Sequence, residues 1–215
     1  MKHNIFLIGF MGSGKSHWGH IWALKNGYTF CDLDAEIEKA FGMTVEMIFE
    51  KHGEEKFREL ERYHLKKIEN KKKYLVACGG GTPCFFDNLE WMKNQGKIIY
   101  LKATPGYILN RVMDETSKRP LLKEVNTSEL LFFIQKKLSE REPFYSKAHH
   151  TLEVENLSED SLCFLEEEPL KTSIPNRDVR AKKEAAAQKN EVDESSLIQE
   201  ENVPGINKLK SENHA

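Results

Sequence analysis

Three glycines, a lysine and a serine near the start of the chain have the spacing of a phosphate-binding loop. They lie in the stretch "GFMGSGKS" at residues 9–16, and the glycines of such a loop let successive backbone N–H groups turn toward phosphate oxygens. The N-terminus of the following helix adds partial positive charge, Lys15 can reach the β- and γ-phosphates, and Ser16 can hold Mg²⁺. A plain glycine turn is the alternative interpretation. The pattern predicts a set of six ATP-binding residues: Gly12, Ser13, Gly14, Lys15, Ser16 and His17.

A phosphate loop alone is compatible with a kinase, a GTPase or an ATPase motor. A GTPase needs an Asn-Lys-x-Asp segment to bind its base, and the sequence contains none. A motor is usually larger than these 215 residues. A small-molecule kinase needs an acceptor site and a lid that excludes water, so residues elsewhere in the chain must distinguish a kinase from the other two classes.

Two aspartates in "CDLDAEIE" are the first candidates for an acceptor site. Asp32 and Asp34 end a short apolar run that we expect to be a strand, and side chains two residues apart on a strand share a face. Ligands of open α/β sheets lie beyond the carboxyl ends of the strands. We predict that one carboxylate serves Mg²⁺ through water and that the other accepts hydrogen bonds from substrate hydroxyls. An aspartate that caps the next helix is the alternative.

Two further features are candidates for the acceptor site. Arg58 in "EEKFRELE" is followed three residues later by Glu61, close enough on a helix to hold the guanidinium. An exposed surface pair is the alternative for these two residues. The stretch "ACGGGT" contains three consecutive glycines, Gly79, Gly80 and Gly81, whose lack of side chains would let a ligand approach the backbone. A loose turn is the alternative, because it has the same composition.

Strands and helices alternate along the chain, and this alternation predicts a parallel, doubly wound α/β sheet. Apolar runs predict five strands, at residues 3–10, 28–34, 74–78, 97–103 and 151–155. Amphipathic stretches predict helices at residues 15–27, 35–42, 44–53, 54–73, 87–95, 105–115, 128–143 and 158–167, the seventh ending at its proline. Gly27 is the expected C-cap of the first helix and Thr44 the N-cap of the third. The stretch 116–126 interrupts the pattern and is expected to be a mobile loop.

The composition bounds the domain organisation and the partners. Of the 215 residues, 39% are hydrophobic, enough for one sizeable core. We expect a domain at residues 1–168 and a polar, disordered tail at residues 169–215, because no aromatic residue occurs from position 171 onward. The net charge of -2 offers no basic field for nucleic acid.

The cellular compartment is predicted from the apolar runs and the cysteines. The apolar run before Lys15 is too short for a signal peptide, and no later segment reaches the roughly 20 apolar residues of a membrane helix. Four cysteines without paired spacing indicate free thiols in a reducing compartment, and a zinc site at Cys78 and Cys84 would lack a second ligand pair. We expect a cytoplasmic monomer without nucleic-acid or membrane partners.

Taken in order, the motifs "GFMGSGKS", "DLD", "FRELE", "GGG", "RPLL" and "EREPFY" resemble the shikimate kinase family over residues 2–168. This family transfers the γ-phosphate of ATP to the 3-hydroxyl of shikimate, a step toward chorismate and the aromatic amino acids. The resemblance implies the three-layer α/β/α fold of the P-loop kinases, with a five-stranded parallel sheet and a mobile lid. It also implies ATP and shikimate as substrates and Mg²⁺ as cofactor.

The resemblance implies roles for single residues. Asp34 would bind the ring hydroxyls and assist deprotonation, and Arg119 of "KRPLL" would be the lid arginine that reaches the ATP phosphates. These two residues and Lys15 would form the catalytic set, and Arg111 would stack on the adenine base. The residues that bind shikimate would be Asp34, Arg58, Gly79, Gly80, Gly81 and Arg141, with the two arginines on its carboxylate; those that hold Mg²⁺ would be Ser16 and, behind a water, Asp32.

Two other functions stay open. One is a small kinase of the same fold that acts on gluconate or a nucleoside monophosphate, since Arg58 and Arg141 favour a carboxylate-bearing acceptor without excluding gluconate. The other is a catalytically idle nucleotide-binding module with the tail as its working part, against which the intact acceptor residues argue. Thr82 and Pro83 follow the glycine run where the family has a small aliphatic residue, which leaves the backbone path there open.

Overall fold

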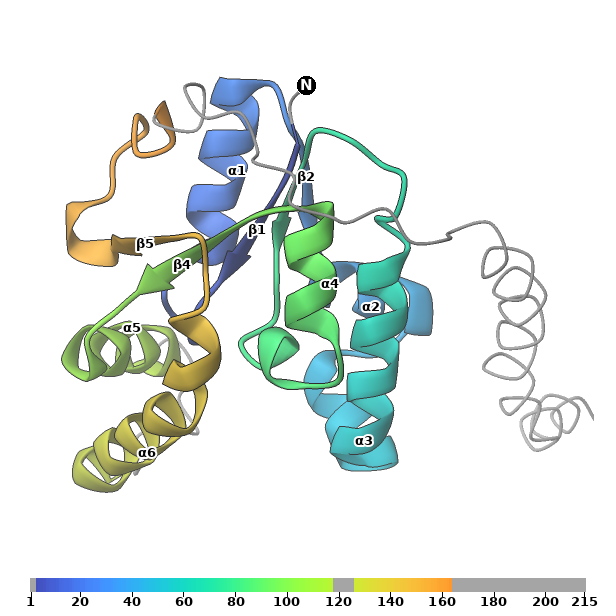
Figure 1. The fold of residues 1–215 in the computed structure, drawn as a ribbon. Coiled ribbons are helices and arrows are strands. Elements are labelled where there is room, and N and C mark those ends of the chain that lie inside the picture. Colours follow the sequence, from blue (N-terminus) through green and yellow to red (C-terminus); the bar gives the residue numbers. More distant parts are fainter. Residues whose placement is uncertain (1–2, 118–125, 164–215) are drawn as a thin grey trace, which may run out of the picture. The chain divides into compact units, whose positions relative to one another are not determined.

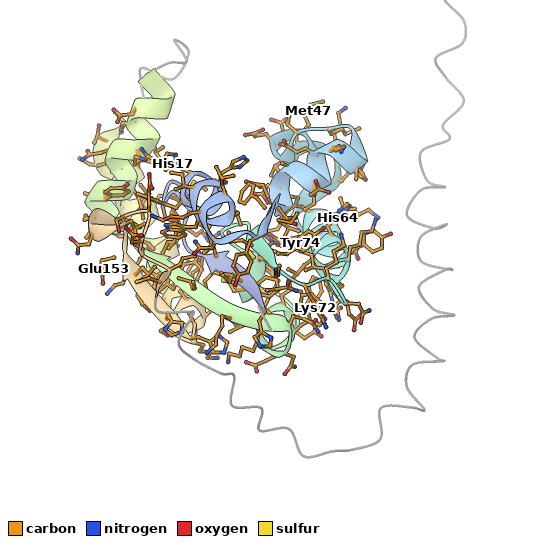
Figure 2. All side chains as sticks on the ribbon, turned by 90° about the horizontal axis from the view of Figure 1, so that it is seen from above. His17, Met47, His64, Lys72, Tyr74 and Glu153 are labelled. Atoms are coloured by element: carbon orange, nitrogen blue, oxygen red, sulfur yellow. The ribbon has the colours of Figure 1, made fainter. Side chains whose placement is uncertain are left out.

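The computed structural model describes residues 3–117 and 126–163, and their strands form one sheet in which all neighbours are parallel. The strand order is β2-β3-β1-β4-β5, so the first strand of the chain lies at the centre (Figure 1). Figure 2 shows Tyr74 of β3 and Glu153 of β5 toward opposite edges of the sheet. The strands are β1 (Asn4–Ile8), β2 (Thr29–Asp32), β3 (Tyr74–Ala77), β4 (Gly96–Lys102) and β5 (His150–Glu153). The expected five-stranded parallel sheet is confirmed.

Helices cover both faces of this sheet, which gives the predicted three layers (Figure 1). The α-helices are α1 (Lys15–Asn26), α2 (Leu33–Phe41), α3 (Val45–Lys66), α4 (Asn88–Gln95), α5 (Pro105–Ser117) and α6 (Thr127–Tyr145). Two short 3₁₀ segments are η1 (Thr82–Cys84) and η3 (Val154–Asn156).

The two hydrophobic cores follow from the alternation of side chains along a strand. Phe6 and Ile8 of β1 belong to the core on one face, where α2, α3 and α4 pack. Ile5 and Leu7 belong to the core on the other face, where α1 and α5 pack. Because both faces of β1 are covered, the whole strand is buried, which explains its continuous apolar run.

The helix boundaries agree with the sequence at several capping residues. Gly27 ends α1 with φ 68°, a left-handed conformation that glycine adopts readily. The Thr44 side chain accepts a hydrogen bond from the Met47 N–H at the start of α3. Gly53, at φ 81° and ψ 174°, interrupts α3, so the two helices expected on either side of it form one kinked element.

Two expectations about helix ends are wrong. Helix α6 does not stop at Pro143 but continues to Tyr145, because a proline so near the end of a helix removes only one N–H bond of its last turn. Of the helix expected at residues 158–167, the described residues 158–163 form mainly turns. There the Ser158 and Ser161 side chains and the nearby backbone bond to one another instead of building a ladder.

Several expectations concern residues that lie outside the described part of the chain. These are Arg119, most of the loop at residues 116–126, and the tail at residues 169–215. Within residues 3–117 and 126–163, no helix is long and apolar enough to cross a membrane.

The central strand β1 and its neighbour β4 approach each other closely at one glycine. Gly96 pairs with Asn4 across β4 and β1, and a Cβ at Gly96 would overlap the Asn4 backbone carbonyl. Gly96→Ala should therefore lower the free energy of unfolding by roughly 1–3 kcal/mol or more, the cost of overpacking. Gly106→Ala is the matched control, because a Cβ there meets nothing within 4 Å and alanine favours the helix α5. Chemical denaturation checks both variants, and equal stabilities would contradict the role given to Gly96.

Candidate active site

A cavity of about 340 Å³ lies at the carboxyl ends of the central strands. Its wall comes from the segments that follow β1, β2 and β3, together with one residue of α5, as expected for a ligand site in an open α/β sheet. In Figure 2, His17 at the start of α1 lies well apart from Tyr74 at the amino end of β3. The cavity is lined by Met11, Gly12, Gly14, Lys15, Ser16, His17, Asp32, Asp34, Ala77, Cys78, Gly80 and Arg111.

The loop at the base of this cavity has the geometry that the glycine spacing predicts. Gly12 and Gly14 have φ 75° and 85°, in the left-handed region where a larger residue would be strained. The Lys15 ammonium is buried and donates to the carbonyls of Gly9 at 2.9 Å and Phe10 at 2.8 Å. Burial lowers the pKa of Lys15 to about 8, although the nearby carboxylate of Asp34 opposes this shift. The cation is thus held inside the loop.

The other residues expected to bind ATP are divided between the cavity and the interior. The side chains of Ser16 and His17 are exposed, and Arg111 lies beside Gly12, whose Cβ would be 3.6 Å from the arginine Cβ. Ser13 is fully buried and faces Gly9, so its side chain is not part of the cavity wall. The structure therefore brings Arg111 to the phosphate loop from another element and leaves the Ser13 side chain beneath it.

Ser16 and Asp32 form the candidate Mg²⁺ position. The Ser16 hydroxyl donates to Asp32 Oδ2 at 2.5 Å, and Asp32 Oδ1 accepts a bond from the Ala35 N–H at 3.3 Å. Asp32 therefore caps helix α2 and faces the phosphate loop at the same time. A hydroxyl and a carboxylate are oxygen donors of the kind Mg²⁺ prefers. Within the described residues no cluster of three His, Cys, Asp or Glu could hold a metal.

Asp34 presents a carboxylate oxygen to the site. Its Oδ1 atom is buried and has no hydrogen-bond partner among the described residues. Burial, together with the negative charges of Glu61 and Asp32, raises the pKa of Asp34 to about 6, although the positive charges of Lys15 and Arg58 oppose the shift. This carboxylate is therefore costly to keep charged and has an acceptor atom available for a hydroxyl donor.

The glycine run after β3 is the point where the candidate acceptor residues converge. A Cβ at Gly79 would lie 2.5 Å from Glu61 Oε1 and 2.8 Å from Asp34 Oδ1. A Cβ at Gly80 would lie 3.1 Å from Arg141 Nη1, and one at Gly81 would lie 2.6 Å from the Arg58 guanidinium. Each glycine thus leaves room for a different charged side chain, and a loose turn does not explain this arrangement.

Arg58 is buried and not part of an exposed surface pair. Its Nη1 donates to Glu61 Oε2 at 2.9 Å, and Glu61 is completely buried. Its Nε and Nη2 donate to Glu54 Oε1 at 3.2 Å and 2.9 Å, and the guanidinium lies 4.4 Å above the Phe85 ring. The spacing of four residues between Glu54 and Arg58 could have indicated the second pair. Nothing in the local sequence indicates the contact with Phe85, which comes from a distant segment.

Arg141 reaches the glycine run from helix α6. Its guanidinium lies 5.2 Å above the Phe10 ring and next to Gly80. The Tyr145 hydroxyl, one turn further along the helix, donates to the Gly80 carbonyl at 2.5 Å. Tyr145 ends the motif "EREPFY", and its local spacing does not indicate this contact with a distant segment. Arg58 and Arg141 thus approach the turn from two different helices, with Asp34 on a third.

Comparison with known proteins shows which family the chain is similar to. A model of the shikimate kinase family matches residues 11–168. A shikimate kinase of Phocaeicola vulgatus is 42% identical over 155 residues, which cover 72% of this chain and 89% of the relative. A shikimate kinase of Thermodesulfovibrio yellowstonii is 40% identical over 160 residues, which cover 74% of this chain and 90% of the relative.

Solved structures of shikimate kinases have a similar fold. A crystal structure of shikimate kinase from Bacteroides thetaiotaomicron has a TM-score of 0.67 at 38% identity and covers 73% of this chain and 89% of its own. A shikimate kinase from Acinetobacter baumannii, solved in complex with shikimate, has a TM-score of 0.62 at 30% identity, with 92% and 96% covered. The match over most of the described residues shows that this chain belongs to the shikimate kinase family.

Proposed function

We propose that this protein transfers the γ-phosphate of ATP to the 3-hydroxyl of shikimate and releases shikimate 3-phosphate and ADP. The observation that carries the proposal is the convergence of Arg58, Arg141 and Asp34 on one glycine turn beside the phosphate loop. Two planar guanidinium groups suit a carboxylate, and a carboxylate with a free oxygen suits ring hydroxyls. Shikimate carries both groups on one small ring.

Lys15, Asp34 and Arg119 are the residues to which we assign the chemistry. The 3-hydroxyl oxygen forms a bond to the γ-phosphorus while the bond to the bridging oxygen of ADP breaks. Asp34 accepts a hydrogen bond from the attacking hydroxyl and takes up its proton. Lys15 and Arg119 neutralise the charge that spreads over the transferred phosphoryl group, because this reaction depends mostly on positioning and electrostatics.

Ser16 and Asp32 would hold Mg²⁺, the serine directly and the aspartate through water. Their hydroxyl and carboxylate oxygens lie together at the edge of the loop and fit this ion. The ion, when bound with ATP, would neutralise charge on the β- and γ-phosphates. Arg111, exposed above Gly12, would pack on the adenine base, and His17 would contact the nucleotide beside it.

We also infer the boundaries and the setting of the enzyme. The catalytic domain would comprise residues 1–168, since the family model ends at residue 168, and the polar tail at residues 169–215 would lie outside it. Free thiols and the absence of a basic field favour a cytoplasmic monomer that binds neither nucleic acid nor membrane.

The first prediction concerns the acceptor. Purified protein with ATP and Mg²⁺ should release ADP when shikimate is added, and not with gluconate or nucleoside monophosphates, because only shikimate pairs a ring carboxylate with ring hydroxyls. A coupled ADP-release assay with each acceptor checks this. Turnover with gluconate alone would refute the assignment of the acceptor, and turnover with none would favour an idle nucleotide-binding module.

The second prediction separates two arginines. Arg141→Ala should raise the KM for shikimate by about tenfold or more with a smaller change in kcat, because the carboxylate contact exists before and during transfer. Arg119→Ala should instead lower kcat, because its contact with phosphate strengthens as charge spreads. Lys136→Ala is the control, an exposed residue on the same helix as Arg141. Steady-state kinetics with both substrates measure KM and kcat for each variant. An unchanged KM for shikimate in Arg141→Ala, or a change in that KM alone in Arg119→Ala, would contradict these two roles.

The third prediction concerns stability. The folded pKa of Asp34, about 6, lies above the unfolded value of about 3.9, so Asp34 makes the fold less stable as pH rises from about 4 to 6. Asp34→Asn should therefore stabilise ligand-free protein at pH 8, by about 3 kcal/mol at most, and have no such effect below pH 4. Denaturation in the presence of a chelator measures the difference at both pH values. A variant that is less stable at pH 8 would contradict this account.

A further inference from the structure

Thr82 lies directly beneath the acceptor site. It is completely buried at the start of η1, and its hydroxyl donates to Glu61 Oε1 at 2.5 Å. Two further bonds hold its backbone: the Thr82 N–H donates to the Gly79 carbonyl at 3.1 Å, and the buried Asn88 side chain donates to the Thr82 carbonyl at 3.0 Å. The direction of the Thr82 hydroxyl is thus set by the turn that also carries the glycines.

The bond from Thr82 completes the partners of a buried carboxylate. Glu61 is 0% exposed, and its other oxygen, Oε2, accepts the bond from Arg58. A buried carboxylate is stable in the charged form only when it is paired and its remaining acceptor atoms are satisfied. Thr82 supplies a hydroxyl donor to Oε1, at the place where a Cβ on Gly79 would contact Glu61 Oε1 and Asp34 Oδ1 together.

We propose that Thr82 is a positioning residue of the acceptor site, whose hydroxyl keeps Glu61 ionised and directed at Arg58. Glu61 in turn holds Nη1 of the guanidinium while Glu54 holds Nε and Nη2, so that the group stays packed against Gly81 of the glycine run. The inference rests on the proposed function, because it assigns Arg58 to the carboxylate of the acceptor. Thr82 itself touches no substrate.

The groups around Glu61 determine how its charge responds to pH. Burial raises the pKa of Glu61, while Arg58, the Thr82 bond and Arg141 lower it. Without the hydroxyl, the pKa of Glu61 should rise further, and Glu61 would become protonated at a higher pH and weaken its hold on Arg58 Nη1, leaving Glu54 as the carboxylate bound to the guanidinium. The charged or titratable groups that face Glu61 come from five elements or their ends: Arg58 of α3, Asp34 of α2, Arg141 of α6, Cys78 after β3 and Cys84 of η1.

Kinetics of two variants test the proposal. Thr82→Val keeps the shape of the side chain and removes the hydroxyl, and it should raise the KM for shikimate about tenfold while the KM for ATP and kcat change much less. Thr82→Ser should restore the wild-type KM. The KM ratio of Thr82→Val to wild type should be larger at pH 6 than at pH 8.5. Thr151→Val on the edge strand β5 is the control and should leave every constant unchanged.

A measurement without substrate separates this proposal from the proposed function. In ligand-free protein labelled with ¹³C at glutamate carboxyls, the titration midpoint of Glu61 should rise in Thr82→Val and return in Thr82→Ser. If Thr82→Val does not fold, Thr82→Ala, which removes the same hydroxyl without adding bulk, replaces it. An unchanged midpoint, an unchanged KM, or a serine variant as poor as the valine variant would overturn the proposal. If the wild type phosphorylates no shikimate, the proposed function fails, and the titration alone decides whether Thr82 controls Glu61.

Discussion

The proposed acceptor site depends on a turn that carries no side chains. Because residues 79–81 are all glycine, the Arg58 guanidinium, the Arg141 guanidinium and the carboxylates of Asp34 and Glu61 can pack directly against backbone. A single methyl group at Gly79 or Gly81 would occupy space that a charged atom now fills. Three helices therefore bring opposite charges to within a few ångströms of one another and of the phosphate loop, which is the arrangement a small anionic acceptor needs.

The order of the strands determines which segments flank the phosphate loop on each side. The phosphate loop follows the central strand β1, and the glycine run follows β3, which pairs with β1 in the register Leu7↔Ala77. The two loops are therefore neighbours in space although about 65 residues separate them in sequence. Strand β4 flanks β1 on the other side and leads into α5, which carries Arg111. The glycine run thus lies on one side of the phosphate loop, and Arg111, which we propose to contact the nucleotide, lies on the other.

Burying the charged groups of this site lowers the stability of the fold. Burial shifts the pKa of Lys15 down and that of Asp34 up, so each group is pushed toward its neutral form. Hydrogen bonds compensate only some of them: Glu61 has Arg58 and Thr82, whereas one oxygen of Asp34 has no partner in the described structure. Unsatisfied polar groups of this kind are expected where a protein is built to bind a ligand, since stability and activity place opposite demands on the same residues.

The sequence by itself determined the features that local spacing encodes. The phosphate loop, the alternation of strands and helices and the caps at Gly27 and Thr44 each depend on a few neighbouring residues, so they could be predicted. Other features could not be predicted from the sequence: the burial of Arg58, its contact with Phe85 and the bond from Thr82 to Glu61. Both contacts join segments more than twenty residues apart. Only the tertiary structure decides such contacts, since pairing and burial depend on which elements pack together and not on the period of either one.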